Sequence, residues 1–422
     1  MSNQKKQWGA IIVMIALFAM IAFVTNLCSP MAIIVKNDFG ASNVLAQIGN
    51  YGNFIAYLVM GIPAGMIIAK IGYKKTALLG LVIGIIGILI QWASGHVGKE
   101  YAFAIYLIGA FISGFTMCIL NCVVNPMLNL LGGGGNKGNQ LIQIGGVFNS
   151  TAAVCVYILM GALIGDAAKA HIADATPALM IALAIFVIAF IVISFTKIDE
   201  PEQAPVDTSL IKGALSFRHF KLGILGIFLY MGIEVGVPTY ILQFLTSEQG
   251  GSMAASTVGL IVAVYWLMML VGRFIGGAIG GAVSSRTQIT IVSTLTIVLV
   301  LFGMFAPESM QVNVPAIDWA TLTVTSESVP VGIFAFLLVG LCTSVMWGGI
   351  FNMAVEGLGK YTAIASGIFM TMVSGCAVMV AIQGWVADLT GSYMTSYWVV
   401  VFCAAYLLFY ALVGSRVSKR EE

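Results

Sequence analysis

Twelve long apolar stretches divide the chain and constrain its fold more than any other feature. Each is long enough to cross the hydrocarbon core of a bilayer as a helix, which takes about 20 residues. Because lipid offers the backbone no hydrogen bonds, a spanning segment must be a helix or a strand of a closed barrel, and barrel strands are only about half as long. The stretches cover residues 9–35, 45–69, 76–94, 102–130, 141–165, 177–196, 221–245, 255–280, 288–306, 331–355, 363–386 and 395–415. The sequence therefore predicts an all-α membrane protein with twelve transmembrane helices.

The composition agrees with a membrane protein and excludes other classes. Hydrophobic residues make up 60% of the 422 residues and charged residues only 9%, whereas a soluble domain carries about 25% charged residues. Soluble enzymes and nucleic-acid-binding proteins are therefore excluded. The seven cysteines all lie in apolar runs, where we interpret them as small packing residues. We expect no enzymatic activity, no metal and no organic cofactor.

Lysine and arginine residues gather on one side of the predicted membrane. With the N-terminus in the cytoplasm, fifteen of them fall in cytoplasmic segments and three, Lys36, Lys99 and Lys169, fall outside. Cytoplasmic loops of membrane proteins carry such an excess. The bias holds along the whole chain, which agrees with an even number of spans. We expect both termini in the cytoplasm and the long polar loop 306–330 on the external side.

A polar cytoplasmic segment divides the twelve spans into two sets of six. We predict an N-terminal six-helix bundle over residues 1–196, a linker over 197–220 and a C-terminal six-helix bundle over 221–422. A weak repeat supports this division, because residues 125–132 and 352–359 share an Asn and a Leu-Gly pair at the same spacing. Two pseudo-symmetric halves are typical of secondary transporters, which bind their substrate between the halves near the membrane midplane.

Among the seventeen carboxylates, only Glu234 lies near the middle of a span. A charge there costs about 2.5–3.5 kcal/mol on insertion scales, so an intramembrane acid is a candidate functional group. The membrane interior favours a protonated carboxyl group, which suits a carrier that loads and releases one proton per cycle. Tyr230 and Pro238 lie one turn before and one turn after it, on the same helix face. Proline bends a helix and frees carbonyl groups for a polar ligand. Simple packing of the kink and a permanently protonated Glu234 are the alternatives.

Arg273 is the single basic residue inside a predicted span. It lies near the cytoplasmic end of the eighth stretch, where it can reach the interface or bind helix-end carbonyl groups of a neighbour. We expect a structural role at the gate for Arg273, together with Tyr230 and Pro238. Direct substrate binding is the alternative for Arg273.

Neutral amide side chains cluster at one depth of the N-terminal half. Amides offer paired donors and acceptors, as a hydroxyl-rich neutral ligand requires, although they also join helices to one another. We predict a substrate site formed by Glu234, Trp347 and amides of both halves. These amides are Asn50, Asn53, Asn121, Asn125, Gln143, Asn149 and Asn352. Tyr57 shares a helix face with Asn50 and Asn53. Three aromatic residues, Trp347, Trp385 and Tyr265, are candidates for stacking on a sugar ring.

Five short motifs spread along the chain form a recognisable pattern. They are Asn125-Pro126 with Leu131-Gly132, Phe148-Asn149-Ser150, Tyr230-Met231-Gly232-Ile233-Glu234-Val235, Gly272-Arg273-Phe274, and Trp385-Val386-Ala387-Asp388 with Gly391. With these motifs, nearly the whole chain resembles the fucose permease type of sugar transporter in the major facilitator superfamily. The resemblance implies proton-coupled uptake of monosaccharides by alternating access between two six-helix bundles.

Two positions depart from the pattern of that family. The family usually has an Asp where this chain has Ser29 and a Glu where it has Asn121, and both acids are implicated there in coupling or sugar binding. Three alternatives follow. Glu234 alone carries the proton, or sodium replaces it with oxygen ligands from Ser29, Asn121 and Asn125, or the protein is a uniporter. The substrate can also differ, for example an N-acetylated sugar.

We therefore predict a monomeric sugar importer of the bacterial inner membrane, with a proton as the coupling ion at Glu234 and sodium as the alternative. The expected partners are a small sugar and the lipid bilayer, and no nucleic acid. A membrane receptor that binds a nutrient without transporting it, and an efflux pump for amphipathic drugs, are the rival functions. The polar amides favour a hydrophilic ligand over a drug.

Overall fold

The computed structural model describes residues 7–39, 48–131, 135–164, 171–198, 200, 209–279, 283–307, 309–318, 323–358 and 361–417. Each of the twelve predicted stretches falls on helices. The first six correspond to α1 (Trp8–Phe39), α3 (Ile48–Ile71), α4 (Tyr73–Ser94), α5 (Lys99–Leu131), α6 (Gly135–Ile164) and α7 (Thr176–Phe195). The last six correspond to α9 (Arg218–Thr246), α10 (Ala255–Ile279), α11 (Ser285–Phe305), α12 (Val331–Val355), α13 (Thr362–Thr371) continued by η4 (Met372–Ser374) and α14 (Gly375–Thr390), and α15 (Tyr393–Ser396) continued by α16 (Trp398–Phe409) and η5 (Tyr410–Gly414). Short helices η1 (Ile172–Ala175), α8 (Ser209–Ala214) and η2 (Glu248–Gly250) lie between them.

The long helices have the length and composition of membrane spans. Counting the described residues alone, ten helices are long and apolar enough to cross a membrane. Two shorter apolar helical portions, Phe54–Ile68 and Ile144–Val156, lie within α3 and α6. The prediction of an all-α membrane fold is confirmed.

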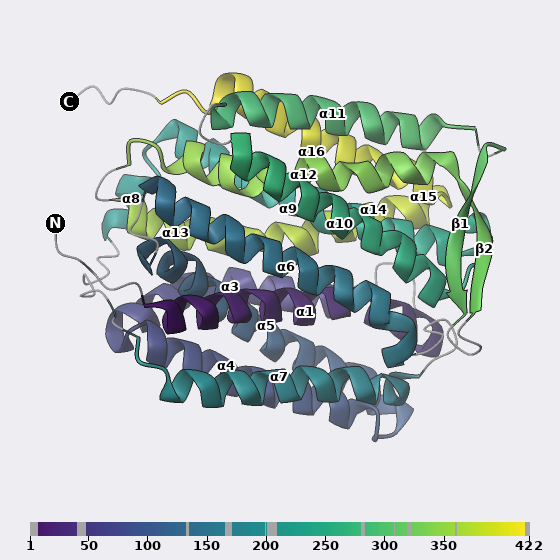
Figure 1. Ribbon diagram of the computed structural model, residues 1–422, viewed down its shortest axis with the longest axis horizontal. Helices are drawn as coiled ribbons and strands as arrows, with labels where there is room; N and C mark the ends of the chain where they lie inside the picture. The colour runs from purple at the N-terminus through teal and green to yellow at the C-terminus, as the bar shows by residue number, and fades with distance from the viewer. Residues whose placement is uncertain are drawn as a thin grey trace.

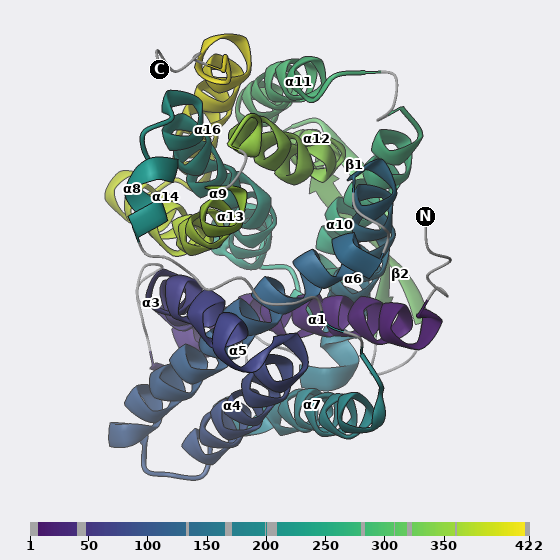
Figure 2. The ribbon, with the colours of Figure 1, turned by 90° about the vertical axis from the view of Figure 1, so that its left-hand side faces the viewer.

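The long helices run side by side along the long axis of the molecule (Figure 1). α1 begins and η5 ends at the same end of the bundle. Seen from that end, α1, α3, α4, α5 and α7 lie on one side and α9, α11, α12, α14 and α16 on the other (Figure 2). We call α1 to α7 the N-terminal group and α9 to η5 the C-terminal group. The two groups meet where α6 packs against α10 and where α3 packs against α13 and α14.

A two-stranded hairpin follows α11 and was not predicted from the sequence. β1 (Gln311–Asp318) pairs antiparallel with β2 (Thr323–Pro330), and Gln311 lies opposite Pro330 in the register. β1 begins with Val residues that alternate with polar residues, and β2 contains Val and Thr, which strands favour. The hairpin lies at the end of the bundle opposite the start of α1 (Figure 1). Residues 311–318 and 323–330 of the polar loop expected at 306–330 thus form strands.

A carboxylate that follows α7 holds the tight turn between α3 and α4. The two oxygens of Glu200 accept hydrogen bonds from the backbone N–H groups of Tyr73 and Lys74, at 2.7 and 2.8 Å. The Lys74 ammonium group donates to the carbonyl oxygens of Ser194 and Thr196, at 3.0 and 2.8 Å. These bonds satisfy two N–H groups that the first turn of α4 leaves without helical partners. They also tie the start of α4 to the end of α7.

Gly72 lets the Glu200 carboxylate approach this turn. Its φ of 82° and ψ of 171° lie in a region that is essentially restricted to glycine. A Cβ atom at this position would overlap the Glu200 carboxylate. A side chain at residue 72 is therefore excluded for two independent reasons.

We expect Gly72→Ala to destabilise the protein, because it strains the backbone and displaces Glu200 from the start of α4. The cost should be about 1–3 kcal/mol, seen as a lower midpoint of thermal unfolding in detergent. Gly65→Ala is the matched control, since a Cβ at Gly65 would have no atom within 4 Å and alanine favours a helix over glycine. Equal midpoints for the two variants would contradict the assignment of Gly72 and Glu200.

Candidate functional site

A cavity lies between the N-terminal and C-terminal groups of helices. Its walls come from α1, α3, α5 and α6 on one side and from α9, α10, α12, α13 and η4 on the other. It holds about 1420 Å³ of empty space, including the part that opens to solvent. The cavity therefore has room for a small hydrophilic molecule together with water.

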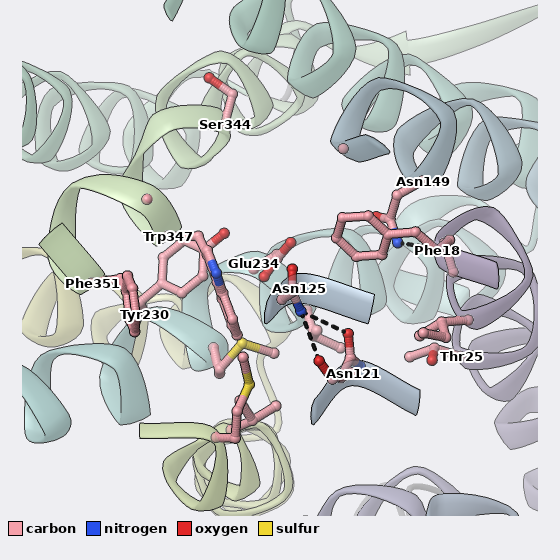
Figure 3. Close-up of a pocket in the computed structure, with 18 of the residues that line it drawn as sticks. Phe18, Thr25, Asn121, Asn125, Asn149, Tyr230, Glu234, Ser344, Trp347 and Phe351 are labelled. Carbon is pink, nitrogen blue, oxygen red and sulfur yellow. Dashed lines mark hydrogen bonds between the residues drawn. The ribbon is translucent and has the colours of Figure 1, made fainter. Parts of the chain in front are cut away.

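Amide side chains form the side of the cavity that belongs to the N-terminal group (Figure 3). The Asn121 amide nitrogen donates to the Tyr57 hydroxyl group at 2.7 Å. The Asn125 amide nitrogen donates to the backbone carbonyl of Asn121 at 3.1 Å and to its side-chain oxygen at 3.4 Å. Asn149 donates to the backbone carbonyl of Phe18 at 2.9 Å. Because each amide nitrogen is held by a protein acceptor, the orientation of each amide is fixed before any ligand enters.

Aromatic rings form the side that belongs to the C-terminal group. The ring centroids of Tyr230 and Trp347 are 6.3 Å apart, in an edge-to-face arrangement. Trp347 also meets Phe369 at 5.7 Å and a right angle, and Phe351 lines the cavity one turn further along α12. Such contacts favour one ring orientation. Trp347 is therefore held as a rigid apolar surface that faces the amides.

Glu234 projects from α9 into the cavity between these two sides (Figure 3). Its side chain is half-buried because it faces the cavity instead of a packed interface. The charge of Arg273 and the hydroxyl group of Tyr230 both interact electrostatically with the Glu234 carboxyl group. In the described part of the chain, no group of three or more His, Cys, Asp or Glu side chains is close enough to hold a metal ion. Arg273 is the basic side chain that interacts electrostatically with the Glu234 carboxyl group.

Arg273 connects the two groups of helices. Its guanidinium group, on α10, donates a hydrogen bond to the backbone carbonyl of Gly146 on α6. A Cβ atom at residue 146 would lie 3.2 Å from a guanidinium nitrogen of Arg273, so glycine allows this close approach. The same guanidinium group also acts on Glu234. Arg273 thus binds the backbone of the opposite helix group and interacts electrostatically with Glu234, the carboxylate among the described residues that line the cavity.

Ten of the side chains singled out in the sequence line this one cavity. They are Tyr57, Asn121, Asn125, Asn149, Tyr230, Glu234, Pro238, Arg273, Trp347 and Asn352. The repeat partners Asn125 and Asn352 line it from opposite groups, α5 and α12. The roles of these residues stay predictions.

Other side chains singled out in the sequence lie elsewhere. Those of Ser29, Asn50, Asn53 and Gln143 fall outside the part that the structure describes. Trp385 is 58% exposed on the outside of α14, and Tyr265 is completely buried between helices. Neither lines the cavity. The expectation that Trp385 and Tyr265 stack on a sugar was therefore wrong, because a helix face cannot be assigned from residue type alone.

The structure adds polar and aromatic residues to the cavity wall that the sequence did not single out. They include Thr25 and Asn26 on α1, Trp266 on α10 and Ser344 on α12. Thr25 and Asn26 are a polar pair within the first apolar stretch. They therefore carry the same sequence signal as the other amides, a polar side chain inside a predicted span. Trp266 and Ser344 carry no comparable signal, because their neighbours in the sequence are equally compatible with packing.

Comparison with known proteins gives several matches over nearly the full length of the chain. A model of the Major Facilitator Superfamily matches residues 13–381. The glucose/galactose transporter of Brucella abortus is 29% identical over 424 residues, which cover 98% of this chain and 96% of that protein. The putative glucose/galactose transporter of Helicobacter pylori is 28% identical and covers 96% of each. The L-fucose-proton symporter of Escherichia coli is 19% identical, over 96% of this chain and 92% of that protein.

Two solved structures share the fold. The crystal structure of the Escherichia coli fucose:proton symporter aligns with a TM-score of 0.73 at 18% identity, over 98% of this chain and 100% of that one. A crystal structure of a Major Facilitator Superfamily transporter in the outward conformation aligns with a TM-score of 0.72 at 20% identity, over 96% and 99%. These likenesses confirm the fold expected from the sequence motifs. Since the family model covers most of the chain, the protein belongs to the Major Facilitator Superfamily, whose members are membrane transporters and not enzymes.

Proposed function

We propose that this protein is a secondary active transporter that imports a monosaccharide or a related hydrophilic sugar across the bacterial inner membrane by alternating access. The observation that carries the proposal is the cavity, where fixed amides face a rigid aromatic surface with one carboxylate between them. The names of the relatives, which refer to glucose, galactose and L-fucose, support a sugar as substrate. In this proposal residues 1–196 and 221–422 are the two bundles that move, and residues 197–220 link them.

The two sides of the cavity suit the two kinds of surface on a sugar. Hydroxyl groups need both donors and acceptors, which the amides of Asn121, Asn125, Asn149 and Asn352 supply. The C–H face of a sugar ring is apolar and packs well on an aromatic ring such as Trp347. The predicted contributions of Asn50, Asn53 and Gln143 belong to the same proposed site.

Glu234 is the proposed coupling residue. The family usually has acids at the positions of Ser29 and Asn121, so a proton-coupled member that lacks both needs another carboxyl group in the cavity. Glu234 lies there, and the E. coli relative is named a proton symporter. A charged Glu234 attracts Arg273, whereas a protonated Glu234 leaves Arg273 to the carbonyl of Gly146. Loading the proton would therefore strengthen the contact between α10 and α6, which makes Arg273 the proposed gate residue, with Tyr230 and Pro238 around it.

The topology and the coupling ion complete the proposal. The excess of lysine and arginine in alternate loops supports cytoplasmic termini, and we propose that one chain is sufficient for transport. Sodium coupling and uniport are the alternatives within transport, and uptake indifferent to external sodium would exclude the first. A nutrient receptor would bind sugar without any flux into proteoliposomes.

Replacing Glu234 by glutamine should uncouple transport from the proton gradient. Glutamine keeps the size of the side chain but cannot bind and release a proton as the Glu234 carboxyl group can. Accumulation of sugar driven by a pH gradient should therefore fall at least about tenfold. Exchange of labelled for unlabelled sugar needs no net proton movement and should persist. Both quantities can be measured in proteoliposomes with labelled galactose, glucose and fucose.

The control for this experiment is Glu248→Gln, the same substitution at an exposed residue after α9. It should leave accumulation and exchange unchanged. Undiminished accumulation by the Glu234→Gln protein would assign the coupling role to another group.

Trp347→Ala should weaken sugar binding. Loss of the aromatic surface should cost about 1–2 kcal/mol, or about 5- to 30-fold in Kd, as measured by calorimetry or ligand-induced thermal shift in detergent. Trp385→Ala removes an equally large side chain from the outside of the bundle and should leave Kd unchanged. Equal Kd values for the two variants would place the sugar elsewhere.

A further inference from the structure

Pro238 leaves one backbone carbonyl of α9 without its helical partner. In a regular α-helix the N–H group of each residue donates to the carbonyl four positions earlier. Proline has no N–H group, so residue 238 cannot donate to the carbonyl of Glu234. The carbonyl without a helical donor therefore belongs to the residue that carries the carboxyl group of the cavity. A buried carbonyl that lacks a hydrogen bond is costly, above all inside a membrane.

A tyrosine on a neighbouring helix supplies the missing donor. The Tyr265 hydroxyl group, on α10, donates to the backbone carbonyl of Glu234 at 3.1 Å. Its oxygen also lies 3.2 Å from the hydroxyl oxygen of Thr343 on α12. Because a carbonyl can only accept, the single hydroxyl proton of Tyr265 goes to Glu234. The Thr343 hydroxyl group has the carbonyl oxygen of Gly340 as an acceptor as well, at 3.1 Å. The Tyr265 side chain is completely buried and does not line the cavity.

The same region of α9 is held from a second point. The Tyr230 hydroxyl group, one turn before Glu234, donates to the backbone carbonyl of Thr343 at 3.3 Å. Thr343 is therefore contacted by Tyr230 of α9 and by Tyr265 of α10. α10 also carries Arg273, which interacts electrostatically with the Glu234 carboxyl group. Side chains of neighbouring helices thus hold the turn of α9 from which Pro238 removes one helical hydrogen bond.

We propose that Tyr265 is a positioning residue for Glu234, whose hydroxyl group replaces the helical hydrogen bond that Pro238 removes and so fixes the direction of the carboxyl group. This inference rests on the proposed role of Glu234 as the coupling acid. Tyr265 does not line the substrate cavity, and its hydrogen bond goes to the backbone carbonyl of Glu234, so we propose that it acts through the backbone. Its contribution should therefore appear in proton coupling and not in the affinity for sugar.

The direct test is Tyr265→Phe, which removes the hydroxyl group and keeps the ring. Uptake driven by a pH gradient in proteoliposomes should fall about fivefold, the order of one lost buried hydrogen bond, while the Kd for sugar changes less than about twofold. The pH at which uptake is half-maximal should also move, because the carboxyl group would change its distance to Arg273 and Tyr230, the charged and titratable groups that act on it. Unchanged uptake and an unchanged pH profile would overturn the proposal.

A double-mutant comparison separates positioning from a general loss of packing. Pro238→Ala restores an N–H group that can donate to the Glu234 carbonyl, so the Tyr265 hydroxyl group becomes dispensable. We expect the fivefold effect of Tyr265→Phe to shrink to less than about twofold when measured in the Pro238→Ala background. An equal effect in both backgrounds would overturn the proposal, whatever Pro238→Ala does by itself.

Tyr397→Phe is the matched control. Its hydroxyl group is also buried and also donates to a carbonyl of α9, that of Val237 at 3.2 Å, but residue 241 is Ile and can supply that carbonyl with a helical N–H group. The effect of Tyr397→Phe should be the same in both backgrounds, and the pH profile should not move. If Tyr265→Phe alone does not fold, the double variant Pro238→Ala, Tyr265→Phe should fold, because residue 238 then supplies an N–H donor to the Glu234 carbonyl. Failure of both variants to fold would overturn the proposal.

The outcome also distinguishes this inference from the proposed function. Full coupled uptake by Glu234→Gln would refute the coupling role itself. Loss of coupling in Glu234→Gln, together with an equal effect of Tyr265→Phe in both backgrounds, would refute only the positioning role.

Discussion

Every backbone N–H and C=O group that lies in hydrocarbon must find its partner within the protein. This requirement makes the twelve apolar stretches helical, and it makes any break in a helix an event that another side chain must compensate. Pro238 is such a break in α9, and the hydroxyl group of Tyr265 compensates for it at the carbonyl of Glu234. The Arg273 contact to the Gly146 carbonyl likewise places a side-chain donor on a helix backbone. The need for a hydrogen-bond partner at every backbone N–H and C=O group thus shapes the fold and also the surroundings of the candidate coupling residue.

The second constraint is the cost of charge within a membrane. The chain keeps nearly all its charged residues in loops and places one carboxyl group, Glu234, near the middle of a span. The nearby Arg273 offsets part of the cost of that charge and also contacts the opposite helix group. In the proposed mechanism, a change in the charge of Glu234 would therefore change a contact between α10 and α6. A coupled carrier requires such a link between protonation and the packing of the two groups.

The fold was largely predictable from the sequence because hydropathy and segment length report directly on spanning helices. The location of Glu234 and of four asparagines in one cavity was also predictable, since polar groups in apolar stretches rarely face lipid. The position of Arg273 in the same cavity wall was not predicted, because its place in the sequence indicated the cytoplasmic end of the span. Helix faces were harder to assign. Trp385 and Tyr265 both looked suitable for stacking, yet one lies outside the bundle and the other is buried between helices. The bond from Tyr265 to Glu234 joins residues 31 positions apart, and the sequence offers no signal for it beyond the proline. The hairpin was missed because the polar composition of residues 306–330 indicates a loop, although polar residues are also compatible with solvent-exposed strands.

The most direct test of the central claim, that sugar entry is coupled to a proton at Glu234, is to follow pH during sugar uptake. Protein in proteoliposomes without any imposed ion gradient would be given external sugar while a pH-sensitive dye reports on the medium. The account predicts that the external medium becomes more alkaline as sugar enters, and that this signal disappears in the Glu234→Gln protein although sugar still binds. Net sugar entry without any pH change in the unsubstituted protein would contradict it.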